Sequence, residues 1–403
     1  MAAVLSFTIF VAVLGARPNI APRAPSSALR AGCLHEFRPL FASEAGLLGA
    51  CSNFSDTLLA FAQRDPKTAL LDKAGWDALA TGNPRAAAEA FREAIAGDPK
   101  NARLHLGAGT AAFLERRDGD ARHELEQTLE LDPKLKQARV VLGQVLYRAG
   151  DLPSAIRIYE TVVTETPADT QSADRLDRWR REAELHDRMR QTLDAHFTVS
   201  FEGPAEAALA TLALEALDRA YWRIGDRLAT FPSNPVSVVL YTAEQFRDIT
   251  RSPAWAAGAY DGTIRVPMGG VIDDPKELDR VLAHEFTHAL VRTLAPRNVP
   301  TWLNEGLATA LETGDLDWAR ERIRRAAQPM SLDRLRTSFG RFTGDQARLA
   351  YATSALAVGR IIDEAGGFAI ANLLRDLGEG VEFETAFAHR IQRSLTDFQA
   401  AIQ

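Results

Sequence analysis

Residues 281–290 read Val-Leu-Ala-His-Glu-Phe-Thr-His-Ala-Leu, and this stretch decides how the C-terminal half of the chain is understood. Two histidines four positions apart lie on one face of a helix, about one turn apart, so His284 and His288 can reach the same metal ion. Glu285 falls between them, beside such an ion rather than on it. A carboxylate there can take a proton from a water molecule, so the pattern predicts a metal site with a general base.

The residues around this stretch indicate a complete helix. Residues 274–277 read Asp-Pro-Lys-Glu, which supplies an N-cap, a proline at the first helical position and a capping-box glutamate, and Pro296 predicts the end. The alternative is an amphipathic core helix that carries two hydrogen-bonded histidines. The flanking apolar stripe favours the metal site, because it could hold an ion away from bulk water; its members are Leu278, Val281, Leu282, Phe286, Ala289 and Leu290.

A second helix is expected after Pro300, and it offers a third ligand. Residues 301–308 read Thr-Trp-Leu-Asn-Glu-Gly-Leu-Ala. Glu305 lies 17 positions after His288, which is enough for the first helix to end and the next to fold back antiparallel to it. We expect Gly306 to let these two helix backbones approach closely.

The His-Glu-x-x-His pattern followed by residues 302–308 resembles the glutamate zincin metallopeptidases, and specifically the peptidase MA-like domains that are often joined to helical repeats. The resemblance covers about residues 196–403. It implies one Zn²⁺ per chain on His284, His288 and Glu305, with Glu285 as general base and a peptide or protein as substrate. The metzincin pattern is excluded, because Val291 stands where its glycine belongs and no third histidine follows.

Composition sets the frame for the rest of the chain. With 403 residues, of which 46% are apolar and 25% charged, the chain can bury two or three ordinary cores. The net charge of -6 and the pI near 5.8 provide no basic surface for nucleic acid or for an anionic membrane. We therefore expect no nucleic-acid partner.

Residues 1–54 read as a leader and linker. Residues 2–16 contain no charge but are too short to span a bilayer, so no transmembrane helix is expected. They match the apolar part of a signal peptide, although no lysine or arginine precedes them. Two localisations stay open: an exported protein, periplasmic or extracellular, in which Cys33 and Cys51 could pair, or a cytoplasmic one in which both stay reduced.

From residue 68 the sequence repeats with a period of 34 residues. Prolines, glycines, alanines and large apolar residues each recur at this interval: Pro99, Pro133 and Pro167; Gly75, Gly109 and Gly143; Ala87, Ala121 and Ala155; Phe91, Leu125 and Tyr159. The pattern resembles tetratricopeptide repeats and predicts an α-helical solenoid over residues 55–170. It would hold three repeats, a possible half repeat at about 55–66 and a connecting or capping helix at 171–195.

Such an array usually presents a surface to an extended peptide or to a partner protein, so we expect a protein partner or a substrate segment on the repeats. The alternative is a rigid scaffold with no ligand of its own. Overall, the fold class is α+β: a helical solenoid followed by a gluzincin-type domain with a small mixed sheet and many helices.

The order of elements after the repeats supports this domain. Strands are expected at 196–202, 235–241 and 263–267, with helices at 205–230 and 243–250 between them. A proline at the end of the last strand suits a sheet edge. In the family that the chain resembles, a substrate lies along such an edge, which would place Thr263, Ile264, Arg265 and Val266 in the cleft; the alternative is a purely structural strand.

Tyr351 lies in a later helical segment that resembles the tyrosine-bearing helix of these peptidases. Its phenol could stabilise the oxyanion of the reaction, while the alternative is a core tyrosine with a satisfied hydroxyl. The sequence thus predicts a zinc metallopeptidase joined to repeats. The alternative is an interaction protein whose peptidase-like domain is inactive.

Overall fold

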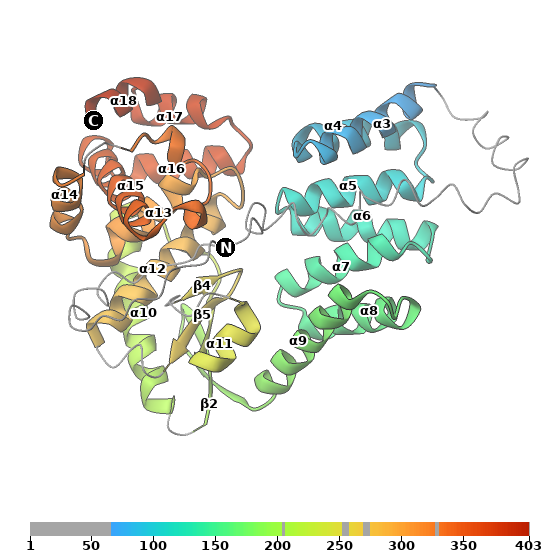
Figure 1. Ribbon diagram of the computed structural model, residues 1–403, viewed down its shortest axis with the longest axis horizontal. Coiled ribbons are helices and arrows are strands. Elements are labelled where there is room, and N and C mark those ends of the chain that lie inside the picture. Colours follow the sequence, from blue (N-terminus) through green and yellow to red (C-terminus); the bar gives the residue numbers. More distant parts are fainter. Residues whose placement is uncertain (1–65, 204–205, 252–257, 269–274, 327–329, 403) are drawn as a thin grey trace, which may run out of the picture. The chain divides into compact units, whose positions relative to one another are not determined.

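The computed structural model describes residues 66–203, 206–251, 258–268, 275–326 and 330–402 (Figure 1). These residues form two compact units, one that ends at Ala183 and one that begins at Glu184. The expected leader, both cysteines and the half repeat at 55–65 lie outside the described residues. No helix in the described part of the chain is long and apolar enough to cross a bilayer.

The first unit is a stack of helix pairs, in which each helix packs on the next along the chain. Asparagine and aspartate side chains cap several of these helices at their N-termini, as Asn83 and Asp151 do. The helices are α3 (Pro66–Ala80), α4 (Pro84–Gly97), α5 (Ala102–Leu114), α6 (Asp118–Leu131), α7 (Lys136–Arg148) and α8 (Leu152–Glu165). Three helix pairs therefore confirm the helical solenoid.

The repeated glycines explain the period of the array. Each lies in the first helix of a pair and faces the large apolar residue of the second helix; the pairs are Gly75 with Phe91, Gly109 with Leu125, and Gly143 with Tyr159. A Cβ atom added at Gly143 would lie 2.5 Å from the Tyr159 ring. The two helices can therefore cross closely only where the first one has no side chain.

Helix α9 (Thr170–His186) closes the repeat array. Trp179 stacks on Tyr147 with ring centroids 4.8 Å apart and also contacts Tyr159. The expected helix over 171–195 is wrong beyond His186, because strand β1 (Met189–Leu193) follows and pairs with the next strand. None of the five residues of β1 is buried, and its two apolar residues, Met189 and Leu193, stand at its ends, so only its pairing to a neighbour makes it a strand.

The second unit contains a five-stranded sheet in the order β1-β2-β3-β5-β4. Strands β2 (Phe197–Glu202), β3 (Val236–Thr242) and β5 (Ile264–Met268) are parallel, joined by helices α10 (Glu206–Leu228) and α11 (Ala243–Thr250). β1 pairs antiparallel with β2, and β4 (Ala259–Tyr260) pairs antiparallel with β5. The elements expected between residues 196 and 267 are thus confirmed.

The expected edge position is wrong for Ile264 and Arg265. These two residues pair with β3 on one side and with β4 on the other, so β4 is the edge of the described sheet on this side, and β1 is the opposite edge. β4 has only two residues, so the sequence shows no alternation of apolar and polar residues from which this strand could be predicted.

Alternate residues of the central strands enter two different cores. Val238 and Leu240 of β3 face α10 and α12, whereas Val239 and Tyr241 face α11. Helix α12 (Pro275–Leu294) therefore lies against one face of the sheet, with its middle buried. The remaining elements are α13 (Thr301–Thr313), α14 (Asp317–Arg324), the 3₁₀ turns Asp333–Leu335 and Phe339–Arg341, α15 (Gly344–Ala365), α16 (Gly367–Gly378), α17 (Phe383–Ile391) and α18 (Leu395–Ile402).

Gly306 does permit a close helix crossing, but not the expected one. A Cβ atom added there would lie 2.5 Å from the Ser354 carbonyl oxygen, so the glycine faces α15 rather than α12. Helix α13 is thus held between α12 and α15. This arrangement presents the other face of α13 to the two histidines of α12.

Candidate metal centre

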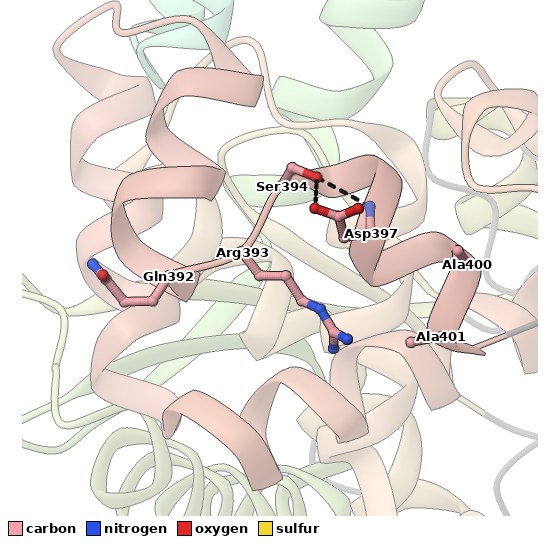
Figure 2. Close-up of a pocket in the computed structure, with 6 residues that line it drawn as sticks. All are labelled: Gln392, Arg393, Ser394, Asp397, Ala400 and Ala401. Carbon is pink, nitrogen blue, oxygen red and sulfur yellow. Dashed lines mark hydrogen bonds between the residues drawn. The ribbon is translucent and has the colours of Figure 1, made fainter.

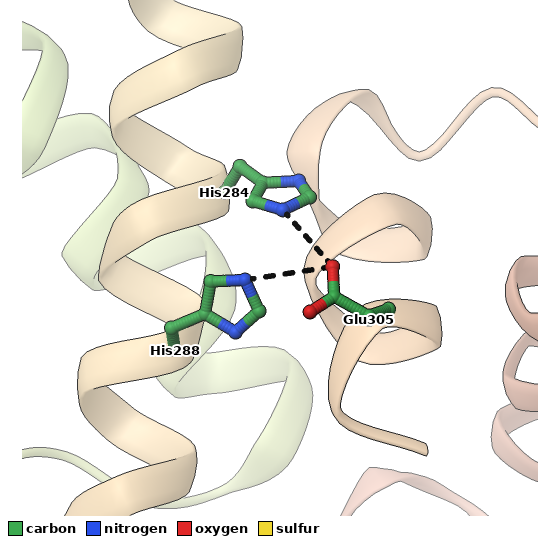
Figure 3. Close-up of side chains that lie close together, drawn as sticks. All are labelled: His284, His288 and Glu305. Atoms are coloured by element: carbon green, nitrogen blue, oxygen red, sulfur yellow. Dashed lines mark ion pairs between the residues drawn. The ribbon is translucent and has the colours of Figure 1, made fainter. Parts of the chain in front are cut away.

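Helices α12 and α13 bring three ligand-type side chains together (Figure 3). His284 and His288 project from successive turns of α12, and Glu305 faces them from α13. Each histidine Nε2 lies 3.9 Å from Glu305 Oε2. The predicted ligand residues are therefore neighbours, all at least 95% buried.

The other ring nitrogen of each histidine is held by α13. His284 Nδ1 lies 2.9 Å from Glu312 Oε2, and His288 Nδ1 lies 3.1 Å from Asn304 Oδ1. A carboxylate and an amide oxygen only accept hydrogen bonds, so both Nδ1 atoms carry the proton. Each Nε2 therefore presents its lone pair toward the other ligands.

Burial keeps both imidazoles neutral. Burial, with the nearby charge of Arg280, lowers the pKa of His284 to about 3. Burial, with the neighbouring His284, likewise lowers the pKa of His288 to about 3. A neutral imidazole is the form that binds a metal ion, so the two residues are ready ligands at neutral pH.

Glu285 points into the same buried space from α12. Burial and the neighbouring Glu305 raise its pKa well above the ordinary value of 4.5. A Cβ atom added at Gly258, the residue before β4, would lie 2.7 Å from Glu285 Oε1. Backbone that leads into the edge strand therefore passes directly over this carboxyl group.

Glu305 has a second neighbour on α15. The Tyr351 hydroxyl hydrogen-bonds its carboxyl group, and burial raises the pKa of Glu305 to about 8. Burial and Glu305 together raise the pKa of Tyr351 well above 10.0, so the phenol keeps its proton. The structure thus places the predicted Tyr351 beside the ligand set.

The polar atoms of this cluster fit a metal ion. Within the residues that the structure describes, His284 Nε2, His288 Nε2, Glu305 Oε2 and both carboxyl oxygens of Glu285 are buried without a hydrogen-bond partner. Such atoms are costly unless a ligand satisfies them. The 3.9 Å separations are too long for hydrogen bonds, yet shorter than twice the 2.0–2.2 Å of zinc–ligand distances. A divalent cation there would also favour ionised Glu305, which opposes the effect of burial.

Three residues of the site were not predicted from the sequence: Asn304, Glu312 and Arg280. Glu312 follows Glu305 by seven positions, so two turns of α13 separate them on one face. That spacing could have indicated Glu312. Asn304 and Arg280 belong to the site only through the packing of α12 on α13.

The strand residues expected in a substrate cleft do not reach this cluster. Ile264 and Val266 are fully buried in the core beneath α10 and α12. Arg265 points to the opposite face, where it binds Asp261 and donates to the Tyr241 hydroxyl at 2.6 Å. Ile264 and Arg265 thus lose the edge position on which their expected role depended.

A hollow of about 760 Å³ lies elsewhere, where α17 ends and α18 begins (Figure 2). The Ser394 hydroxyl donates to Asp397 Oδ2 at 2.6 Å and accepts from the Asp397 backbone N–H at 3.0 Å. These bonds cap α18, so the polar groups are already satisfied. The lining residues include no member of the metal cluster; they are Gln392, Arg393, Ser394, Asp397, Ala400 and Ala401.

Comparisons with known proteins agree with this division. Residues 216–395 match the model of the peptidase MA superfamily, and residues 73–125 and 119–170 match the tetratricopeptide repeat. No curated protein matches the chain.

Several solved structures of repeat domains are similar to part of the chain. The first tetratricopeptide domain of Spaghetti (RPAP3) bound to an HSP90 peptide is 18% identical, with a TM-score of 0.29, over 30% of this chain and 98% of that one. MamA is 23% identical, with a TM-score of 0.29, over 30% of this chain and 72% of the MamA chain. The first such domain of human RPAP3 is 18% identical, with a TM-score of 0.28, over 30% and 94%. From the two family matches, the chain is a tetratricopeptide-repeat protein with a C-terminal domain of the peptidase MA superfamily.

Proposed function

We propose that the protein is a zinc-dependent peptidase that hydrolyses peptide bonds between α12 and α13. One observation carries the proposal: the ligand atoms of His284, His288 and Glu305 converge, with the carboxyl group of Glu285 beside them. Two neutral imidazoles and one carboxylate are the protein ligands of catalytic zinc sites that keep a position open. When bound in such a site, zinc lowers the pKa of a water molecule toward about 7 and polarises a carbonyl group.

The residues of the chain would divide the proton transfers between them. A divalent cation beside Glu285 would favour its ionised form and oppose the effect of burial, and the carboxylate would then accept a proton from the attacking water as the new C–O bond forms. It then delivers that proton to the amine nitrogen as the C–N bond breaks, so one water molecule is consumed for each peptide bond. Tyr351, whose hydroxyl lies at Glu305, is the candidate donor to the developing oxyanion.

Strand β4 is the candidate platform for an extended substrate. It is one edge of the described sheet, and a peptide can add to such an edge by backbone hydrogen bonds. Gly258 precedes β4 and lies against Glu285. A substrate that follows this edge would therefore pass the general base.

The repeats would bring the substrate or a partner protein to the enzyme, because stacked helix pairs offer an extended binding surface. The test is the rate of proteolysis with residues 68–170 removed. An unchanged rate on a folded substrate, together with unchanged partner recovery, would leave the repeats as a scaffold only.

The test of the enzyme itself combines metal analysis with a cleavage assay. We expect about one zinc per natively purified chain and cleavage of an unfolded protein that a chelator stops and zinc restores. Peptides with blocked ends would separate endopeptidase from exopeptidase action. A chain that holds zinc but cleaves nothing would instead be an interaction protein with an inactive domain, and a chain without zinc would refute the metal site.

A further inference from the structure

Arg280 is a buried cation one turn before His284 on α12, and the proposed reaction assigns it no role. The residue is only 9% exposed. Its guanidinium lies between two carboxylates, Glu277 on the same helix and Glu312 on α13. Buried arginines require such partners, because an unpaired buried charge is strongly destabilising.

The contacts form a continuous chain that ends at the metal ligand. Arg280 Nε and Nη2 donate to the two oxygens of Glu277 at 2.8 and 2.6 Å, a two-pronged bond that fixes the plane of the guanidinium. Arg280 Nη1 donates to Glu312 Oε2 at 3.0 Å. The same oxygen atom accepts the His284 Nδ1 proton at 2.9 Å.

This arrangement fixes the position of one oxygen atom from two sides. The Glu312 side chain is only 11% exposed and lies near Glu285, so its charge needs a nearby cation. Arg280 supplies that positive charge, and its hydrogen bond from Nη1 also fixes where Glu312 Oε2 lies. With Glu312 held, the ring of His284 has one preferred orientation, and its Nε2 points at Glu305.

The second histidine is held by a different kind of partner among the described residues. His288 is oriented by Asn304, a neutral amide that needs no counter-charge. The two ligands on α12 are thus held by different means, one by a chain of charges and one by an amide. Removal of Arg280 should therefore act on His284 alone.

We propose that Arg280 is a positioning residue for metal binding, which acts through Glu312 to aim His284 at the ion. The inference rests on the proposed zinc site. Arg280 touches neither metal nor substrate, so its contribution is the pre-formed orientation of the ligand before the metal arrives. Lysine could supply the charge but not the planar fork.

The experiment measures the zinc dissociation constant of the full-length chain by chelator competition, and the electronic spectrum of the cobalt-loaded chain. Arg280→Gln should weaken zinc binding by about 10–100-fold and change the cobalt bands, as loss of an outer-shell partner does. Arg280→Lys should recover only part of the loss. Arg219→Gln is the matched control, because it breaks an exposed ion pair of 2.6 Å to Asp279, the neighbour of Arg280 on α12.

A double-mutant comparison separates positioning from general stability. If Arg280 acts through Glu312, the double variant Arg280→Gln, Glu312→Gln should have about the same zinc dissociation constant as whichever single variant binds zinc less tightly. Losses that multiply, or an unchanged affinity in folded Arg280→Gln or Arg280→Lys, would overturn the inference. A wild-type chain that binds no zinc would refute the proposed function instead, so the two failures are distinguishable.

Discussion

Two buried histidines, one in each unit, show how packing separates a structural residue from a candidate ligand. In the repeats, His105 Nδ1 lies 2.7 Å from Glu124 and its Nε2 lies 3.0 Å from the Pro99 carbonyl oxygen. In the second unit, His284 Nδ1 has the same kind of partner, Glu312 at 2.9 Å. Its Nε2, however, is buried with no hydrogen-bond partner among the described residues.

The comparison shows that a carboxylate bonded to the Nδ1 atom of a buried histidine does not by itself indicate a metal site. His105 links two helices of the repeat array, and both of its nitrogens are satisfied. In His284 only Nδ1 is bonded, and the buried Nε2 has no hydrogen-bond partner among the described residues. His105 is therefore bonded within the chain through both nitrogens, whereas the buried Nε2 of His284 fits a ligand from outside it.

Removal of a ligand should have the largest effect. His288→Ala should reduce bound zinc to background and abolish cleavage, because two ligands are too few to hold the ion. Zinc analysis and the proteolysis assay measure the two effects. His105→Ala is the matched control in the repeats, and loss of zinc in that variant would break the comparison.

Neutralisation of the proposed general base, Glu285, should have the second-largest effect on activity. Glu285→Gln should lower kcat by about 10²–10⁴-fold, the range of general acid–base catalysis, while zinc content stays at the wild-type value. Rates and metal content are measured on the same preparation. Full activity in this variant would remove Glu285 from the mechanism but leave the metal site standing.

The tyrosine beside Glu305 provides a finer comparison. Tyr351→Phe should lower kcat by about 10²-fold with zinc retained, the size expected for one oxyanion donor. Tyr147→Phe is the matched control, because Tyr147 in the repeats also donates to a glutamate, Glu182, at 2.8 Å. Equal rates for both variants would make Tyr351 a packing residue.

Overpacking should affect the repeats without affecting the site. Gly143→Ala would place a methyl group 2.5 Å from the Tyr159 ring, so it should destabilise this unit by about 1–3 kcal/mol. Gly119→Ala, where no atom lies within 4 Å, should be neutral or slightly stabilising. Calorimetry measures both, and zinc binding should be unchanged in each.

The smallest effect expected is a pH dependence of the metal-free chain. Burial raises the pKa of Glu305 to about 8 and that of Glu312 to about 7, above the ordinary 4.5. Above pH 4.5 the folded state holds protons that the unfolded state has lost, so their contribution to stability falls as the pH rises from about 4.5 and levels off once the pH has passed 7 and 8. His284 and His288, with pKa values of about 3, oppose this only below about pH 6.5.

Without zinc, the unfolding temperature of the second unit should therefore fall from pH 6.5 to about 8 and then level off. Excess zinc should remove the fall, because the ion keeps the carboxylates charged at every pH in this range. Scanning calorimetry at several pH values checks both conditions. A fall that zinc does not change would place its cause outside the ligand set.

The repeats and the ligand residues could be predicted from the sequence for the same physical reason. The glycine and the apolar anchor of each repeat lie 16 positions apart, and His284 and His288 share one helix face. Such relations depend on helical spacing alone. The sheet between residues 197 and 268 was also predictable, because β2, β3 and β5 have apolar residues in strand patterns.

The tertiary structure alone decided the rest. β1 and the edge strand β4 exist only because a neighbour pairs with them, and Gly306 serves α15 because three helices pack together. Asn304 and Arg280 join the site only through the α12–α13 contact, and the spacing of Glu312 from Glu305 indicates its helix face but not its bond to His284. The sequence alone thus indicated which residues can bind a metal, since His284 and His288 share one helix face and Glu305 follows in the next predicted helix, whereas packing between helices decided how those residues are held.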